Sequence, residues 1–271
     1  MNHHLLCIHR FVSLTIVTNN SNHQIEEMSI KKDKYMPHTH KADKEKVRAM
    51  FNDIAPKYDF LNHFLSGGID ILWRKKVRRL LAPHKPKLIL DVATGTGDLA
   101  IELYKLKPNT IIGVDIAQQM LDIGNAKIKR KGLEKYIDLY VGDAENMWFE
   151  DNIFDAITVA FGVRNFENLN KGLKEMQRVL KPGGIVAVLE FSKPKAFPFK
   201  QGYNFYSKYI LPTMGRVVSK SDEAYKYLPD SVQGFAEDKA FLYELEKAGF
   251  VNAKQNRLTM GIATLYSASK K

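Results

Sequence analysis

The chain has 271 residues, of which 45% are hydrophobic and 26% charged, the composition of an ordinary globular protein with a sizeable core. Its single cysteine, Cys7, excludes a disulfide framework and a cysteine-based metal centre, and favours a cytoplasmic location. The net charge of +11 is concentrated in residues 31–87, which hold 15 Lys and Arg against 6 Asp and Glu. Such an excess of positive charge can bind nucleic acid or an anionic membrane surface, or it can simply increase solubility.

The first 40 residues differ from the rest of the chain. Residues 1–40 are polar, rich in His and Asn, and without apolar periodicity. We expect a disordered extension, or an over-long reading frame whose true start is Met28 or Met36. The longest apolar stretch, Leu5–Val17, is interrupted by a His-Arg pair and is too short to cross a bilayer. It also lacks the small-residue cleavage site of a secretory signal.

Residues 41–87 are expected to form an N-terminal helical lid. Between 41 and 65 apolar residues recur at helix spacing, with Pro56 as an expected kink. A second amphipathic helix is expected at 69–81. Its inward face is expected to carry Leu72, Trp73, Val77 and Leu80. Its largely outward residues are expected to be Arg74, Lys75, Lys76, Arg78 and Arg79.

Residues 88–271 are expected to form the core, in which strands and helices alternate. Short apolar runs fit five buried parallel strands: 88–92, 111–114, 137–141, 154–160 and 185–191. Helical stretches are expected between them: 99–106, 120–131 and 169–180. This alternation predicts a doubly wound, Rossmann-like α/β sheet that binds its ligands at the C-terminal ends of the strands.

The alternation stops at Pro194. Residues 194–229 carry eight aromatic residues among basic ones, which predicts a helical insert rather than another strand–helix unit. One helix and two strands are expected to follow it: 237–248, 251–258 and 262–269.

A glycine-rich segment, Asp91-Val92-Ala93-Thr94-Gly95-Thr96-Gly97-Asp98, follows the first expected strand of the core. Its glycines allow the backbone to approach a ligand closely, and the next helix presents amide donors to it. Gly95, Gly97 and Ala100 also satisfy the dinucleotide pattern G-x-G-x-x-G/A. The segment alone therefore fits NAD as well as another nucleoside cofactor.

Carboxylates at three successive strand ends distinguish between these cofactors. Asp91 can meet a cationic amino-acid group, Asp115 can accept both ribose hydroxyls, and Asp143 can accept the adenine amino group. S-adenosylmethionine carries an amino-acid zwitterion and no phosphates, so it suits three carboxylates better than a pyrophosphate does. We therefore predict S-adenosylmethionine as the cofactor and expect no metal.

Two longer patterns are more specific. They are Tyr58-Asp59-x-x-Asn62-x-x-Leu65-Ser66-x-x-x-x-x-x-Trp73 and Arg178-Val-Leu-Lys-Pro-Gly-Gly-x-x-x-x-Leu189-Glu190-x-Ser192. Both resemble the signatures of the ubiquinone/menaquinone C-methyltransferases (UbiE/MenG type). Phe161-Gly-Val-Arg164-Asn165 and Glu190-Phe-Ser-Lys-Pro194 look like internal blocks of that family. The resemblance covers about residues 47–269, with one departure, since Asp70 stands where a histidine is usual.

The resemblance implies a class I methyltransferase fold. Its sheet would have seven mostly parallel strands with an antiparallel last strand, preceded by N-terminal helices and carrying a helical insert before the final strand pair. It implies cofactor contacts at Thr96, Asp115, Asp143 and Ala144, and a lost hydroxyl contact at Ala160, where serine is usual. The implied reaction is C-methylation of a 2-polyprenyl-1,4-naphthoquinol, from demethylmenaquinol to menaquinol, or of the analogous benzoquinol.

A ring carbon beside a phenol becomes a strong nucleophile only when the phenol loses its proton, so the site must supply a base or stabilise phenolate. Arg164 and Asn165 follow the fourth strand at the cofactor edge and are candidates for orienting the quinol oxygen. Tyr58, Asp59 and His63 are candidates for the base. Structural alternatives exist for four of them: an ion pair for Arg164, aromatic packing for Tyr58 and His63, and a surface or capping role for Asp59. A lone histidine favours the structural interpretation.

The expected partner is a polyprenyl quinol, and the aromatic insert 194–229 can line a channel for its tail or simply form a small helical core. With the basic helices, this surface can touch anionic lipid at the inner face of the membrane. The sequence leaves open whether the chain forms a homodimer. No nucleic acid is expected, because no recognition motif is present. The remaining alternatives are a methyltransferase for another hydrophobic acceptor and an NAD-binding oxidoreductase.

Overall fold

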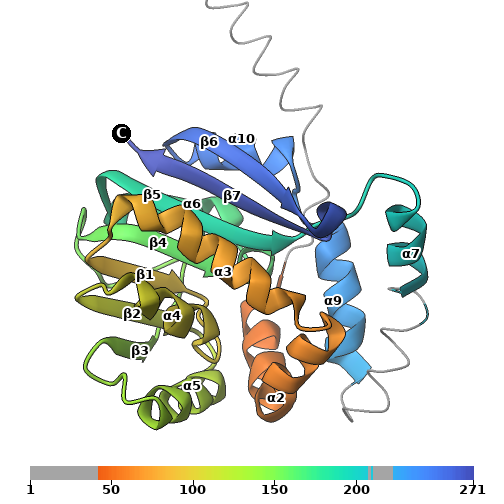
Figure 1. Cartoon of the computed structure of the whole chain (residues 1–271), viewed down its shortest axis with the longest axis horizontal. Coiled ribbons are helices and arrows are strands. Elements are labelled where there is room, and N and C mark those ends of the chain that lie inside the picture. Colours follow the sequence, from red (N-terminus) through yellow and green to blue (C-terminus); the bar gives the residue numbers. More distant parts are fainter. Residues whose placement is uncertain (1–41, 207–208, 210–221) are drawn as a thin grey trace, which may run out of the picture. The chain divides into compact units, whose positions relative to one another are not determined.

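The computed structural model describes residues 42–206, 209 and 222–271 (Figure 1). The expected N-terminal extension, with Met28 and Met36, lies outside the described residues, as does the part of the insert between 210 and 221. In the described part of the chain, no helix is both long enough and apolar enough to cross a membrane.

Seven strands form one sheet in the order β3-β2-β1-β4-β5-β7-β6. Their bounds are β1 Leu88–Val92, β2 Thr110–Asp115, β3 Ile137–Val141, β4 Phe154–Ala160, β5 Leu180–Phe191, β6 Phe250–Leu258 and β7 Ala263–Lys270. The first five strands pair in parallel, whereas β7 is antiparallel to both β5 and β6. The strand order reverses between β1 and β4, which is where sheets of this kind open a ligand crevice. The predicted fold class is confirmed.

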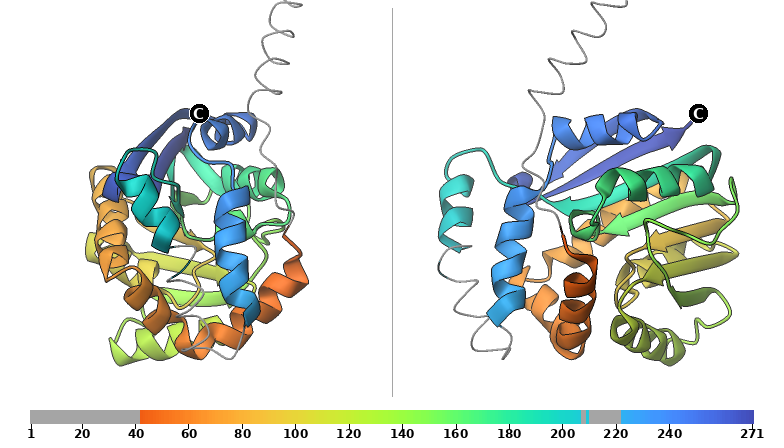
Figure 2. Two further views of the ribbon diagram at one scale, coloured as in Figure 1. Left: turned by 90° about the vertical axis from the view of Figure 1, so that its right-hand side faces the viewer. Right: turned by 180° about the vertical axis from the view of Figure 1, so that it is seen from behind.

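Helices cover both faces of the sheet (Figures 1 and 2). One face carries α6 (Leu169–Val179) and α10 (Lys239–Lys247), and the other carries α3 (Ile69–Leu81), α4 (Asp98–Leu103) and α5 (Gln118–Arg130). The strands feed both cores because successive side chains point to opposite faces. In β1, Leu90 and Val92 pack on the α6 side, while Ile89 packs on the α3 side.

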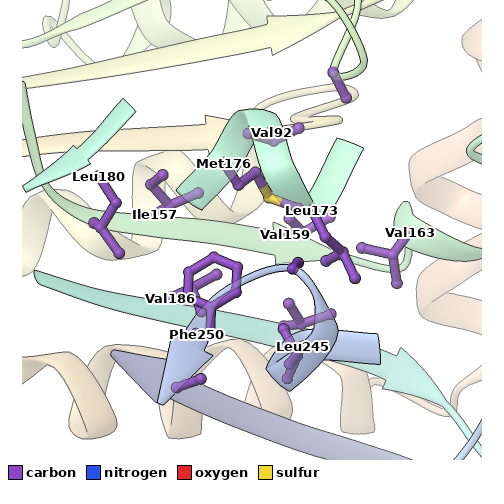
Figure 3. Packing of buried hydrophobic residues seen from close by; sticks show 14 of the residues in the cluster. Val92, Ile157, Val159, Val163, Leu173, Met176, Leu180, Val186, Leu245 and Phe250 are labelled. Carbon is purple, nitrogen blue, oxygen red and sulfur yellow. The ribbon is translucent and has the colours of Figure 1, made fainter. Parts of the chain in front are cut away.

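The core on the α6 side is closely packed (Figure 3). Leu173 and Met176 of α6 and Leu245 of α10 lie against strand residues such as Val159 and Val186, and all five are fully buried. Burial of large aliphatic side chains of this kind is worth about 1.5–3 kcal/mol each. This core holds β4 and β5 firmly, and the residues after both strands reach the candidate site.

Two further helices, α2 (Lys44–Leu65) and α9 (Asp222–Gly234), contact each other at the edge where the parallel strands end (Figures 1 and 2). Asp43 caps α2 by accepting hydrogen bonds from the amides of Glu45 and Lys46, and Pro56 lies inside the helix. The insert also contains α7 (Phe199–Phe205). Short 3-10 turns complete the chain: η1 Ala82–His84, η2 Tyr104–Leu106, η3 Val163–Asn165 and η5 Thr259–Gly261.

The inward face of α3 differs from the prediction at two positions. Leu72 is 56% exposed, and the side chain of Arg74 is only 11% exposed, so both were assigned to the wrong side. The buried face follows the spacing of Trp73, Val77 and Leu81. Arg74 lies one residue after Trp73 and is drawn inward by carboxylates rather than by apolar contacts.

Candidate active site

The turn between β1 and α4 is shaped for close approach to a ligand. Ala93, Gly95 and Gly97 have φ values of 51°, 55° and 75°, in the left-handed region that favours glycine. Gly97 is the N-cap of α4. Ala93 and Gly95 line a cavity of about 640 Å³ at the C-terminal ends of β1, β2 and β4. Five predicted cofactor residues line it: Gly95, Asp115, Asp143, Ala144 and Ala160.

Asp115 is fixed in the wall of this cavity. Its Oδ2 accepts from the amide of Gly95 at 2.8 Å, and its Oδ1 accepts from the amide of Ala117 at 2.9 Å. Burial raises the pKa of Asp115, against the effect of these backbone hydrogen bonds. Each carboxylate oxygen has a further lone pair, so the side chain can still accept from ribose hydroxyls.

Asp143 lies in the same wall and is paired with α2. Its Oδ2 accepts from Lys44 Nζ at 2.7 Å, and its Oδ1 accepts from the amide of Glu145 at 2.9 Å. Lys44 also lies 3.3 Å from a Glu145 oxygen. The wall therefore holds three carboxylates and one ammonium group among the described residues. This set fits the adenine amino group and cationic tail of S-adenosylmethionine, and it suits a pyrophosphate poorly.

Asp91 of β1 and the turn residues Thr96 and Gly97 do not line the cavity wall. Asp91 is buried and accepts from the hydroxyls of Thr94 and Thr158, each at 2.6 Å. Burial raises the pKa of Asp91 to about 6, despite these two hydrogen bonds. Thr96 Oγ1 donates to Asp59 at 2.5 Å. In this structure the side chains of Asp91 and Thr96 hold the turn in place and do not line the cofactor cavity.

A second cavity, of about 770 Å³, adjoins the first, and Phe51, Tyr58 and Phe161 line both. The rings of Phe161 and Phe191 stack with their centroids 4.5 Å apart. Trp73 packs against this pair, with centroid distances of 5.9 Å and 6.1 Å. A wall of flat rings beside a cofactor cavity is suited to a flat aromatic acceptor.

Arg164 lines the second cavity and forms a buried ion pair. Its Nη1 donates to Glu190 Oε1 at 2.7 Å, and the two side chains are 6% and 0% exposed. Its Nε donates to Ser231 of α9 at 3.3 Å, and its guanidinium lies 5.4 Å above the ring of Phe191. Burial raises the pKa of Glu190, and the charge of Arg164 opposes that effect. Arg164 thus has both the predicted position at a ligand cavity and a carboxylate partner.

Asn165 lies beside it and lines the cofactor cavity. Its Oδ1 accepts from the hydroxyl of Tyr227 at 2.9 Å, which ties η3 to α9. Phe161 has a φ of 59°, which is strained for a bulky residue, and its carbonyl accepts from Arg164 Nη1. Asn165 Nδ2 donates to the same carbonyl at 3.5 Å, so both predicted residues also support the strained residue that lines both cavities.

The three candidates on α2 are placed differently. Tyr58 lines both cavities, and burial raises its pKa. The Asp59 oxygens accept from Thr96 and from Lys127 Nζ, the latter at 2.8 Å. His63 Nδ1 lies 2.7 Å from Asp70 Oδ2. Of these candidates, the structure brings only Tyr58 to the cavities.

Several residues at the site were not among the predicted set. Glu190 and Asp70 belong to the sequence patterns quoted above, which marked their positions without giving a role. Lys44 and Ser231 have no local pattern, because they reach the site only through the packing of α2 and α9.

Comparisons with known proteins identify the group to which the chain is related. Residues 39–270 match the model of the ubiE/COQ5 methyltransferase family. The demethylmenaquinone methyltransferase of Bacteroides fragilis is 46% identical, over 90% of this chain and 100% of that protein. The enzyme of the same name from Porphyromonas gingivalis is 44% identical, over 83% and 93%. A ubiquinone/menaquinone biosynthesis C-methyltransferase UbiE from Geotalea daltonii is 45% identical, over 83% and 97%.

Solved structures agree on the fold. A SAM-dependent methyltransferase from Thermotoga maritima aligns with a TM-score of 0.58 and 20% identity, over 82% of this chain and 99% of that one. The [4+2]-cyclase SpnF aligns with a TM-score of 0.60 and 17% identity, over 84% and 96%. A cyclase among these neighbours shows that the fold alone does not fix the reaction. The family match identifies the type of reaction: the chain belongs to the ubiE/COQ5 methyltransferase family and is an S-adenosylmethionine-dependent methyltransferase.

Proposed function

We propose that this methyltransferase acts on the ring carbon of a polyprenyl naphthoquinol and converts demethylmenaquinol to menaquinol. The observation that carries the proposal is the aromatic-walled cavity, which contains Arg164 and adjoins the cofactor cavity at Tyr58 and Phe161. The names of the relatives from Bacteroides fragilis and Porphyromonas gingivalis support the naphthoquinol. The analogous benzoquinol is the alternative, which the name of the Geotalea relative includes.

The chemistry follows from the position of Arg164. Bound S-adenosylmethionine supplies an electrophilic methyl group, so the protein must orient the ring and stabilise negative charge on its oxygen. Arg164 Nη1 and Nε are engaged, whereas Nη2 has no hydrogen-bond partner among the described residues. That group can donate to the quinol oxygen and stabilise negative charge on it, with Asn165 beside it.

The candidates for the base acquire different proposed roles. Tyr58 keeps its proton near neutral pH, as an ordinary tyrosine does, and burial raises its pKa further, so its hydroxyl can orient a ligand at the junction of the cavities. Asp59 and His63 are proposed as positioning residues, since their polar atoms bind Thr96, Lys127 and Asp70.

Turnover by the purified full-length protein tests the proposal. We expect methylation of a chemically reduced short-chain naphthoquinol with a higher kcat/KM than for the matching benzoquinol. The measurement is radiolabel transfer from S-adenosylmethionine to the lipid fraction. The reverse preference would favour the benzoquinol, and transfer to neither ring would contradict the proposal.

We also propose peripheral contact with the cytoplasmic face of a membrane, where a polyprenyl substrate resides. Phe60 and Phe64 of α2 are 59% and 53% exposed, and their rings stack with centroids 5.5 Å apart. Leu72 on α3 is exposed as well, close in sequence to the exposed Lys76 and Arg79. Apolar side chains beside basic ones suit the surface of an anionic bilayer.

Asp115→Ala is expected to weaken binding of S-adenosylmethionine by about 1–3 kcal/mol, the scale for leaving buried hydroxyls without an acceptor. The carboxylate lies in the cavity wall at the end of β2 and also holds the amide of Gly95. Titration calorimetry on the folded variant measures the effect. An unchanged dissociation constant would rule out the assigned contact.

A further inference from the structure

A polar cluster lies in the wall of the second cavity, apart from Arg164. It consists of Ser66, Asp70 and Arg74, from the end of α2 and the start of α3. Asp70 is the centre of the cluster, and its side chain is only 4% exposed. Its Oδ1 accepts from Ser66 Oγ at 2.6 Å, and its Oδ2 accepts from His63 Nδ1 at 2.7 Å and from Arg74 Nη2 at 2.6 Å.

The cluster keeps Asp70 ionised. Burial would raise the pKa of this carboxyl, but the hydrogen bonds from Ser66 and His63 and the charge of Arg74 bring it below the usual range. An ionised carboxylate offers about four acceptor positions and no donor. Three are used by the described residues, and Oδ1 accepts from Ser66 alone. One acceptor position on Oδ1 therefore remains for a ligand in the cavity.

The aromatic pair connects this cluster with the Arg164 region. Phe191 packs edge-to-face against Trp73 of α3, and Arg164 lies above the Phe191 ring. Asp70 and Arg164 share no hydrogen bond or ion pair among the described residues, so the cavity offers two separate polar groups. A 1,4-quinol has two hydroxyls on opposite sides of its ring. If such a ring lies on the aromatic wall with one oxygen at Arg164, its other oxygen can meet Asp70, which lines the same cavity.

We infer that Asp70 accepts a hydrogen bond from the second hydroxyl of the quinol and thereby selects the reduced ring over the oxidised quinone. The inference rests on the proposed quinol substrate. A hydroxyl can donate to the carboxylate, whereas a quinone carbonyl can only accept and would face it with lone pairs. Sites built to bind a hydroxyl discriminate strongly against analogues that lack it. Only the reduced ring is an effective carbon nucleophile, so this selection excludes an unreactive competitor from the same lipid pool.

Ligand binding to the folded protein tests the inference. The probes are a short-chain naphthoquinol kept reduced under anaerobic conditions, the matching quinone, and the monomethyl ether that blocks the hydroxyl distal to the methylated carbon. Calorimetry in the presence of S-adenosylhomocysteine gives their dissociation constants. For the native protein we expect the quinol to bind about tenfold or more tightly than the quinone or the ether, the scale of one hydrogen bond to a charged group.

Asp70→Asn should reduce the ratio of quinone to quinol dissociation constants about tenfold or more, because the amide nitrogen can donate to a carbonyl. Ser66→Ala is a graded variant, because it removes one of the three partners of the same carboxylate but leaves Arg74 and His63 in place, so it should keep more of the preference for the quinol than Asp70→Asn does. Asp122→Asn, which changes an exposed carboxylate on α5, should bind all three probes like the native protein.

Equal binding of quinol, quinone and ether by the native protein would overturn the inference, even if Asp70→Asn failed to fold. An unchanged ratio in folded Asp70→Asn would overturn it too, as would loss of the preference in Ser66→Ala to the same degree. These outcomes remain separate from the proposed function, which fails only if the native protein does not methylate the quinol.

Discussion

Arg164→Lys is expected to lower kcat for a reduced short-chain naphthoquinol by about tenfold or more, and Arg164→Ala by about 10²–10³. The reason is that negative charge gathers on the quinol oxygen in the transition state, where the unengaged Nη2 can donate to it. A lysine keeps the charge but not the planar fork, so it cannot bind Glu190, the Phe161 carbonyl and the substrate together. The affinity for S-adenosylmethionine should barely change, because Arg164 lines the acceptor cavity and not the cofactor cavity.

Steady-state kinetics and calorimetry together measure the two effects. Arg257→Lys is the matched control, since Arg257 also pairs with a carboxylate, Asp238, at 2.6 Å but lines neither cavity. Its kcat should remain near the native value. Normal kcat in Arg164→Lys would refute the proposed role, and a parallel collapse of cofactor binding would show that Arg164 acts only as a structural residue.

The fold was predictable because local patterns and tertiary structure agree. Runs such as Leu88–Val92 and Phe154–Ala160 are largely apolar rather than alternating, because helices cover both faces of a parallel sheet. The cofactor cavity was predictable for a similar reason. Parallel strands end at one edge, so Asp115 and Asp143, found at successive strand ends, had to lie near each other.

The acceptor side was less predictable because one residue along a helix is a turn of about 100°. Tyr58 and Asn62 of α2 line the second cavity, whereas the next residues, Asp59 and His63, face carboxylates and Lys127 instead. Sequence spacing located this part of the helix but did not distinguish Tyr58, which lines the cavities, from Asp59 and His63, which do not. The pairing of Arg164 with Glu190 joins η3, which follows β4, to the neighbouring strand β5, and only the tertiary structure shows it.

Glu190→Gln is expected to destabilise the protein by about 3–5 kcal/mol, the cost of removing one partner of a buried ion pair. The amide would leave the Arg164 guanidinium without a countercharge at a site where its side chain is only 6% exposed. Glu190 also accepts from the amide of Phe191 at 2.9 Å, so the loss reaches the backbone at the end of β5. Urea unfolding followed by circular dichroism gives the free energy of unfolding.

Two variants identify the cause of that loss. Asp151→Asn also removes a carboxylate paired with an arginine, but Asp151 and Arg178 are 65% and 30% exposed and can be hydrated, so the expected cost is about 1 kcal/mol or less. The double variant Arg164→Met/Glu190→Leu removes both charges, and it should be more stable than Glu190→Gln while remaining inactive, since apolar side chains can replace a buried pair at little cost. If the double variant is as unstable as Glu190→Gln, the unpaired charge of Arg164 is not the cause. The pair would then stabilise the fold through its shape and its backbone hydrogen bonds.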